Sequence, residues 1–313
     1  MTDKKRRVNM GADGMLGGKT LKKRKREEKF SPMFLVLFIM LILYTLCILL
    51  PMVWGLLQSF QDPEKLYNPI PWPLDFQFSN YIEAFQKFYV PVKTETGTAY
   101  PTLVYMFGYS FVYAVGAALV STFVPCVVGY LTARFDNWFS RLLNSFVIIA
   151  MALPVVGSLP SELQIARALG LYDTLFGIWI MKSHFLSMYY LVFYARFKGF
   201  SSSYEEAARV DGANYFSIFF RIILPLVTTI FLTVFILQFI NFWNDYYTPL
   251  MYMPSYPTVA YGMYYFNVSQ DNTLASIPMK ITGCMIMMLP VLILFVCFSK
   301  RLMTNLTIGG VKE

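Results

Sequence analysis

The chain has 313 residues, of which 57% are hydrophobic, 18% aromatic and only 14% charged, and its formal net charge is +8. This composition excludes an ordinary soluble globular protein and indicates a chain largely embedded in a membrane. The chain has one histidine, and its four cysteines lack the spacing of metal ligands. No hydrolase or dinucleotide-binding motif occurs either. We therefore expect no enzymatic activity and no cofactor bound by this chain.

The first 32 residues form an arm with two clusters of basic residues. Between the clusters, residues 13–20 come close to the phosphate-loop pattern G-x-x-x-x-G-K-[ST], but Asp13 stands where the first glycine belongs. A working phosphate loop needs a strand before it and a helix after it, and basic runs lie there instead. We interpret the arm as a cytoplasmic segment that can contact anionic lipid head groups, and we expect no nucleic acid partner.

Six apolar runs approach the roughly 20 residues that a helix needs to cross a bilayer. Because lipid offers no partners to backbone polar groups, each run should be helical. We expect membrane-spanning helices at about residues 33–57, 103–131, 142–160, 172–195, 226–250 and 281–299. The third run is the weakest, because Pro154, Gly157 and Pro160 lie near its end.

Most of the 26 Lys and Arg residues fall in segments on one side of these six helices. The positive-inside rule assigns that side to the cytoplasm, together with both chain termini. The predicted fold is therefore all-α, with a membrane domain of six transmembrane helices over residues 33–302. The basic arm 1–32 precedes this domain, and a cytoplasmic tail, residues 303–313, follows it.

Two ionisable residues, Lys182 and His184, lie about halfway along the fourth run. Such groups are costly at membrane depth, which makes a functional role the default interpretation. Two residues apart on a helix is about 200°, so these side chains cannot share one face. Either could line a polar pathway, or it could pair within the bundle or with a second subunit.

The loop between the fourth and fifth runs, which we call the two-helix loop, should begin with a short helix. Ser202 with Glu205, and Ser203 with Glu206, have the spacing of a capping box, so this helix should start near Tyr204. On spacing alone, an amphipathic helix lying at the membrane interface is an equally good interpretation.

A second short helix should follow after a break. Asp211 and Gly212 form a natural stop, with Gly212 supplying the left-handed backbone conformation. From about Asn214, large apolar residues recur at helical spacing. They are Tyr215, Phe216, Phe219 and Ile223. Pro225 should mark the entry into the fifth membrane helix.

The two-helix loop, residues 196–225, resembles the EAA loop in the permeases of ABC importers. The pattern of that loop is E-A-A, three residues, G, nine residues and then I-x-L-P. This chain matches it at Glu206, Ala207, Ala208, Gly212, Ile222, Leu224 and Pro225. The resemblance covers about residues 100–313, and residues 306–312 are similar to the tail of the smaller permease of maltose-type sugar importers.

This resemblance implies a transport subunit of the cell membrane that imports a sugar or oligosaccharide. In that family the permease pairs with a second permease, both dock on a cytoplasmic ATPase dimer, and an extracellular solute-binding protein delivers the cargo. ATP and Mg²⁺ then bind to the ATPase. An amino acid, a peptide or another small polar solute stays open as the cargo. A stand-alone secondary transporter is disfavoured, because no internal repeat is visible.

The resemblance further implies that the two-helix loop couples the ATPase to the membrane helices. Small alanines let a short helix approach a partner closely, acidic groups can pair with basic groups there, and aromatic side chains can anchor the contact. The expected coupling residues are Glu205, Glu206, Ala207, Ala208, Asp211, Gly212, Tyr215, Phe216, Ile222, Leu224 and Pro225.

The fifth run carries one polar face, with Gln238, Asn241 and Asp245 at spacing i, i+3 and i+7 and Asn244 beside them. Amides together with aromatic rings suit a sugar pathway, but helix packing with lipid-facing aromatics gives the same pattern. The interleaved aromatic residues are Phe231, Phe235, Phe239, Trp243 and Tyr247. The candidate pathway residues are Gln238, Asn241, Trp243, Asn244, Asp245, Lys182 and His184.

Two further loops lie on the side opposite the two-helix loop. The proline-rich segment 58–102 is a plausible lid or docking surface. The segment 251–280, by the family resemblance, would face the solute-binding protein. Its candidate contacts are Tyr256, Tyr261, Tyr264 and Tyr265. For Tyr252 we favour a ring at the membrane interface.

Overall fold

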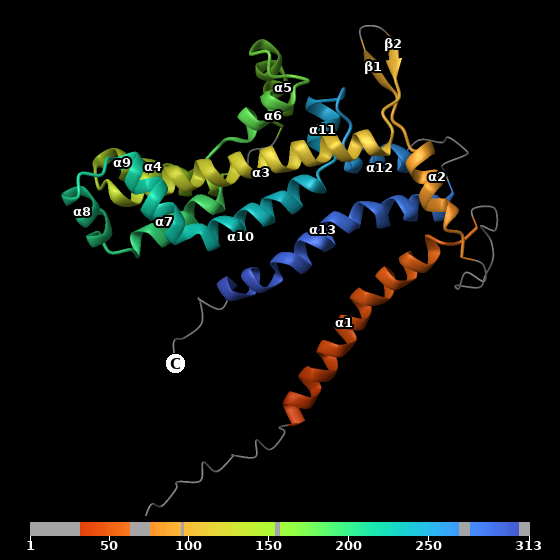
Figure 1. Ribbon diagram of the computed structural model, residues 1–313, viewed down its shortest axis with the longest axis horizontal. Coiled ribbons are helices and arrows are strands. Elements are labelled where there is room, and N and C mark those ends of the chain that lie inside the picture. Colours follow the sequence, from red (N-terminus) through yellow and green to blue (C-terminus); the bar gives the residue numbers. More distant parts are fainter. Residues whose placement is uncertain (1–31, 63–75, 95–96, 154–156, 269–275, 307–313) are drawn as a thin grey trace, which may run out of the picture. The chain divides into compact units, whose positions relative to one another are not determined.

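The computed structural model describes residues 32–62, 76–94, 97–153, 157–268 and 276–306 (Figure 1). The predicted basic arm lies almost entirely outside these residues, as do most of the predicted cytoplasmic tail and the proline-rich part of segment 58–102. The chain divides into two units, Met1–Leu50 and Pro51–Glu313, and the boundary falls inside helix α1 (Pro32–Gln58).

Within the residues that the structure describes, four stretches of helix are long and apolar enough to cross a membrane. They are α1, α3 (Leu103–Arg134), the continuous stretch Tyr215–Trp243 and the first part of α13 (Ile277–Leu306). The stretch Tyr215–Trp243 consists of α9 (Tyr215–Ile218), a π-helical turn (Phe219–Ile223) and α10 (Leu224–Trp243). These four correspond to the first, second, fifth and sixth predicted membrane helices.

The other two predicted membrane helices are interrupted. Residues 142–160 fall on α4 (Trp138–Ala152) and the start of α5 (Leu159–Ala168), and residues 172–195 fall on α6 (Leu175–Lys182) and α7 (Met188–Lys198). The prediction of one continuous helix is therefore wrong for both runs. Hydropathy misses the helix break at residues 183–187, because Phe185 and Leu186 keep the run apolar while its backbone leaves the helix.

In the second unit, α3 is the central helix, and α10 and α7 pack along it (Figure 1). Small residues of α3 allow this close packing. A Cβ atom added at Gly129 would lie 3.1 Å from the backbone nitrogen of Tyr194 in α7, and one added at Gly116 would overlap the Trp179 ring of α6. Helices α10 and α13 also contact each other.

The two ends of this unit carry different elements (Figure 1). Helices α8 (Ser203–Val210) and α9 lie at one end, and α2 (Ser79–Lys87) and α12 (Val259–Val268) lie toward the other. Strands β1 (Val92–Thr94) and β2 (Gly97–Ala99) form an antiparallel hairpin after α2. This hairpin is a small exception to the predicted all-α fold.

Hydrogen bonds join both α2 and α13 to the segment that follows α1. The Asn80 amide donates to the carbonyl oxygens of Ser59, at 3.0 Å, and Gln61, at 2.8 Å. The Thr282 hydroxyl of α13 also donates to the Ser59 carbonyl at 2.9 Å. Buried Phe88, Met106 and Phe266 pack in an apolar cluster at this end.

Candidate functional site

The two-helix loop has the local structure that its sequence predicts around Gly212. Helix α8 ends in a Schellman motif, in which the Ala213 N–H donates to the Ala208 carbonyl at 2.9 Å and the Gly212 N–H donates to the Arg209 carbonyl at 3.0 Å. Gly212 has a φ of +80°, which confirms the predicted left-handed conformation. The Asn214 side chain then caps α9 by accepting a hydrogen bond from the Ser217 N–H at 2.8 Å.

A widened helical turn connects this loop to α10. The Leu224 N–H donates to the Phe219 carbonyl five residues earlier, which is the hydrogen bond of a π-helix. Pro225 follows directly, in the first turn of α10, where its missing N–H is tolerated. Pro225 therefore marks the start of α10, as predicted, but the turn before it was not foreseen.

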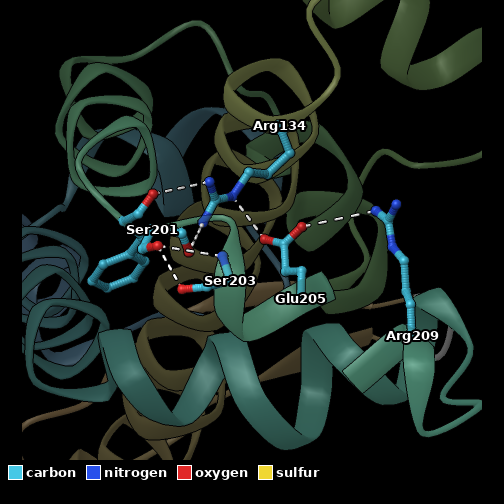
Figure 2. Close-up of polar contacts among 6 residues, drawn as sticks. Arg134, Ser201, Ser203, Glu205 and Arg209 are labelled. Carbon is cyan, nitrogen blue, oxygen red and sulfur yellow. Dashed lines mark hydrogen bonds and ion pairs between the residues drawn. The ribbon is translucent and has the colours of Figure 1, made fainter. Parts of the chain in front are cut away.

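The inward face of α8 is tied to the end of α3 (Figure 2). The Nε atom of Arg134 lies 2.7 Å from the Glu205 carboxylate, and the two side chains are only 12% and 6% exposed. The same guanidinium donates to the carbonyl oxygens of Phe200, at 3.1 Å, and Ser201, at 3.4 Å. Arg209 lies on the other side of the carboxylate, 4.0 Å away.

These contacts correct two predictions about Glu205. Helix α8 starts at Ser203, as expected, but Ser202 makes no side-chain capping bond, so the predicted capping box is absent. The Glu205 carboxylate also does not point toward a partner, because it is buried against Arg134. Sequence spacing could not reveal this pair, since Arg134 lies 71 positions earlier in the numbering of the chain.

The outward face of α8 carries the next acidic residue. Glu206 and Ala207 are exposed, whereas Ala208 is buried with the apolar cluster below the loop. Val210 is 88% exposed at the end of the helix and is a surface residue that the sequence argument missed. Asp211 is exposed beside it.

The aromatic residues of α9 continue this surface. Phe216 is 78% exposed, and Tyr215 is 57% exposed with the Arg209 guanidinium 4.9 Å above its ring. Both line an apolar groove of about 480 Å³ together with Phe135, which directly follows α3. Behind them, Ile222 and Leu224 are half-buried against the cluster under the loop.

The predicted polar face of α10 is only partly available to a pathway. Asn241 and Asn244 are exposed, but Gln238 is 9% exposed. Trp243 is a core residue instead of a pathway residue, because it is 2% exposed and its indole N–H donates to the Met287 carbonyl at 3.0 Å. Phe239 stacks on Trp243 in the same core, with ring centroids 5.7 Å apart.

Asp245 joins α10 to distant parts of the fold. Its carboxylate accepts from the Tyr113 hydroxyl of α3 at 2.9 Å and from the Thr248 N–H at 3.0 Å. Thr248 belongs to α11 (Tyr247–Tyr252), and its hydroxyl oxygen accepts from the Lys182 ammonium at 3.2 Å. The structure thus brings Lys182 and Asp245, separated in the sequence, into one polar chain.

A cavity of about 350 Å³ opens at the helix break, next to the hydrogen-bonded groups of Lys182, Thr248 and Asp245. Lys182 and His184 line it, together with Thr248, Glu162 and Tyr252. The Tyr252 hydroxyl donates to the Glu162 carboxylate at 2.7 Å. The cavity therefore offers ionic and hydroxyl groups at the point where the helix is interrupted.

Tyr252 was expected to present its ring at a membrane interface, but its side chain is 5% exposed in this cavity wall and is therefore buried within the chain. Of the four tyrosines predicted to meet a solute-binding protein, Tyr264 is exposed and the other three are half-buried. Tyr256 contacts Tyr109, and Tyr264 stacks on Tyr246 with ring centroids 4.6 Å apart. Tyr261 and Tyr265 pack against the apolar cluster of the same end.

Comparison with known proteins identifies the family. The model of the family described as "Binding-protein-dependent transport system inner membrane component" matches residues 126–307, which is more than half of the chain. The match includes the two-helix loop, the helix break and α10. Among the described residues, no group of three or more His, Cys, Asp or Glu side chains could hold a metal ion.

Two curated relatives are transport permeases. The arabinooligosaccharides transport system permease protein AraQ of Bacillus subtilis (strain 168) is 29% identical over 206 residues, which cover 65% of this chain and 72% of AraQ. The sulfoquinovosyl glycerol transport system permease protein SmoH of Agrobacterium fabrum is 26% identical over 270 residues, which cover 84% of this chain and 89% of SmoH.

A solved structure shows the same fold. It is the crystal structure of a bacterial ABC transporter involved in the import of the acidic polysaccharide alginate, whose matching chain superimposes with a TM-score of 0.70 at 22% identity. The match covers 86% of this chain and 96% of the other. This chain therefore belongs to the inner membrane components of binding-protein-dependent transport systems, as a multi-pass membrane permease subunit of an ABC importer.

Proposed function

We propose that this permease imports a sugar or oligosaccharide and that a separate ATPase drives it through the two-helix loop. The observation that carries the coupling role is the structure of the loop itself. Helix α8 ends at a left-handed glycine and presents Glu206 and Val210 outward, while its other face is fixed against the body of the chain. A short rigid helix with one free face suits docking into a groove of a partner.

The proposed partners are a cytoplasmic ATPase dimer, a second permease subunit, an extracellular solute-binding protein and the surrounding membrane lipids. ATP and Mg²⁺ would bind to the ATPase, so this chain needs no cofactor for its part of the cycle. Closure of the ATPase would push α8, and the push would reach α10 through the π-helical turn and Pro225.

The proposed topology has six membrane crossings with both termini in the cytoplasm. Four crossings would be α1, α3, α9 to α10, and α13. The interrupted segments α4 to α5 and α6 to α7 would supply the other two. Interrupted helices at membrane depth suit a transporter, because non-helical backbone is tolerated there when it lines a polar cavity.

The proposed cargo class rests on the relatives and on the cavity at the helix break. AraQ and SmoH are named for transport of arabinooligosaccharides and sulfoquinovosyl glycerol, which are both carbohydrates. The Lys182 ammonium, the Thr248 hydroxyl and the Glu162 carboxylate can exchange hydrogen bonds with sugar hydroxyls. Another small polar solute, such as an amino acid or a peptide, is the alternative cargo that this chemistry also permits.

The coupling proposal is tested by copurification. The chain is expressed together with an ATPase, a second permease and a solute-binding protein of the same kind of importer from the same organism, and the membrane complex is purified in detergent. We expect the ATPase to copurify, the complex to hydrolyse ATP and the chain alone to hydrolyse none. ATP hydrolysis by the isolated chain, or a complex that forms equally well without residues 203–225, would contradict the proposal.

The cargo proposal is tested with the solute-binding protein. Purified binding protein is titrated with arabinooligosaccharides and with a mixture of amino acids, followed by calorimetry. We expect heat of binding for the sugars only. Binding of an amino acid, with no response to any sugar, would replace the carbohydrate by the alternative cargo.

A further inference from the structure

We propose that Arg134 is a positioning residue that clamps the coupling helix α8 to α3, so that movement of α8 reaches α3 directly as well as α10 through the chain. This inference rests on the coupling role proposed above and adds a second route for transmission. It also assigns different tasks to two neighbouring acids, with Glu206 facing the partner and Glu205 facing the clamp.

Arg134 contacts α8 itself and the segment that leads into it. Its Nε atom meets the Glu205 carboxylate at 2.7 Å, within α8 itself. Its two terminal nitrogens donate to the carbonyls of Phe200 and Ser201, which connect α7 to α8 (Figure 2). The two hydrogen bonds from the terminal nitrogens orient the planar guanidinium, and the close ion pair at Nε, which is not aligned as a hydrogen bond, holds the Glu205 carboxylate beside it.

The surroundings make this clamp stiff. Arg134 is the last residue of α3, so a force on its side chain acts directly on the helix end. Buried Tyr130 and Ala133 of α3 pack in the same apolar cluster as Ala208 of α8. By contrast, the covalent route from α8 to α10 passes through Gly212 and a π-helical turn.

Burial distinguishes this ion pair from an ordinary surface pair. Arg141 and Asp136 form a pair at 3.2 Å near the same end of α3, but their side chains are 74% and 70% exposed. Such exposed pairs contribute little, whereas breaking one partner of a buried pair leaves an uncompensated charge. The Arg141 pair therefore provides a matched control.

The test follows α3 in the assembled transporter by spin-label distances and needs no cargo. The four native cysteines are replaced by serine, one label is placed at an exposed position of α3 through Val112→Cys, and the second label is placed on the second permease subunit, which lies outside both routes from α8. The probe is Mg·ADP with vanadate, which traps the closed ATPase. In the parent complex we expect the label distance to shift by about 2 Å or more on trapping.

The key variant is the neutral pair Arg134→Gln/Glu205→Gln, because it leaves no buried charge unpaired and should still insert. We expect it to bind the ATPase and trap nucleotide like the parent while the label shift falls by about half or more. Single Glu205→Gln should behave similarly with a less stable complex, and Arg141→Gln should change nothing.

The outcomes separate this inference from the coupling proposal. A full label shift in the neutral-pair variant overturns the clamp, and so does a parent complex in which α3 does not move. Failure of the neutral-pair variant to assemble makes Arg134 merely structural and also overturns the inference. If the parent chain never binds an ATPase, the coupling proposal itself fails, which is a different result.

Discussion

The two-helix loop and the helix break both interrupt helical structure, but different hydrogen bonds stabilise the two interruptions. In the loop, backbone groups of Ala213 and Gly212 close α8, and the neighbouring Asn214 starts α9. At the break, the Lys182 ammonium reaches Thr248, which lies 66 residues away in the sequence. Local sequence therefore specifies the turn from α8 into α9, whereas the break, like the attachment of α8 to Arg134, depends on how distant helices pack.

This difference suits the two proposed tasks. A locally specified loop can keep its shape while it is moved as a body. A break whose polar groups are paired across helices changes whenever those helices move relative to each other. Substitutions in each region test whether force transmission belongs to the two-helix loop and cargo passage to the helix break.

The largest effect is expected at the outward face of the loop. Glu206→Lys should weaken ATPase binding by about 3 kcal/mol or more if the carboxylate meets a basic groove, because attraction becomes like-charge repulsion. Glu206→Gln, which keeps the shape, should lose far less. Copurification at low and high salt measures this, since screening should partly relieve the clash. Equal ATPase recovery with both variants at low salt would remove Glu206 from the docking surface.

Replacement of the left-handed glycine should uncouple the loop. Gly212→Val forces a β-branched residue to a φ of +80° at a cost of about 1–3 kcal/mol. We expect uptake per ATP hydrolysed to fall while the membrane helices still insert. The matched control is Gly199→Ala, since Gly199 also ends a helix but has a φ of −82°. Coupled uptake at the parent level by Gly212→Val would show that its conformation is not required.

At the helix break, loss of the ammonium should affect cargo passage and leave ATPase docking intact. Lys182→Met should lower vesicle uptake by about tenfold, in keeping with a hydrogen bond from a charged group. Thr248→Val should have a smaller effect, and the two changes together should be less than additive. The control is Lys87→Met, which alters an exposed lysine on α2. Reduced ATPase recovery with Lys182→Met would erase the proposed division of tasks.

The smallest effect is expected at the helix caps. Asn214→Ala and Asn137→Ala each remove a side-chain cap, of α9 and α4 respectively, at a cost of about 1 kcal/mol. Both should lower the melting temperature of the complex slightly. Only Asn214→Ala should also lower uptake per ATP hydrolysed, because only that cap lies in the loop. A matching loss of coupling in both variants would argue that general stability controls coupling.

What the sequence could predict follows the same division. The helix stop at Gly212, the helix start near Tyr204 and the entry at Pro225 are local features, and the structure has all three. The Arg134–Glu205 pair and the Lys182–Thr248 contact depend on helix packing, which periodicity in one sequence does not report.

Hydropathy predicts where the long membrane helices lie but does not predict where a helix is broken or which of its faces is buried. Long apolar runs correctly placed α1, α3, α10 and α13, since hydropathy measures transfer into lipid. The same measure could not detect the break at 183–187, because a broken backbone can be as apolar as a helical one. It also could not separate buried Trp243 from exposed Asn241, which share α10.

The π-helical turn at Phe219–Ile223 has a consequence for the register of the chain. It holds one residue more than an α-helical turn, so every side chain beyond it is rotated by about 100° from a continuous α-helix drawn through α9. A helical wheel carried from the two-helix loop into α10 therefore assigns the wrong faces. If one residue were deleted at this turn, the side chains of α10 would rotate by about 100° relative to α9. A different face of α10 would then point into the core, although the sequence of α10 itself would be unchanged.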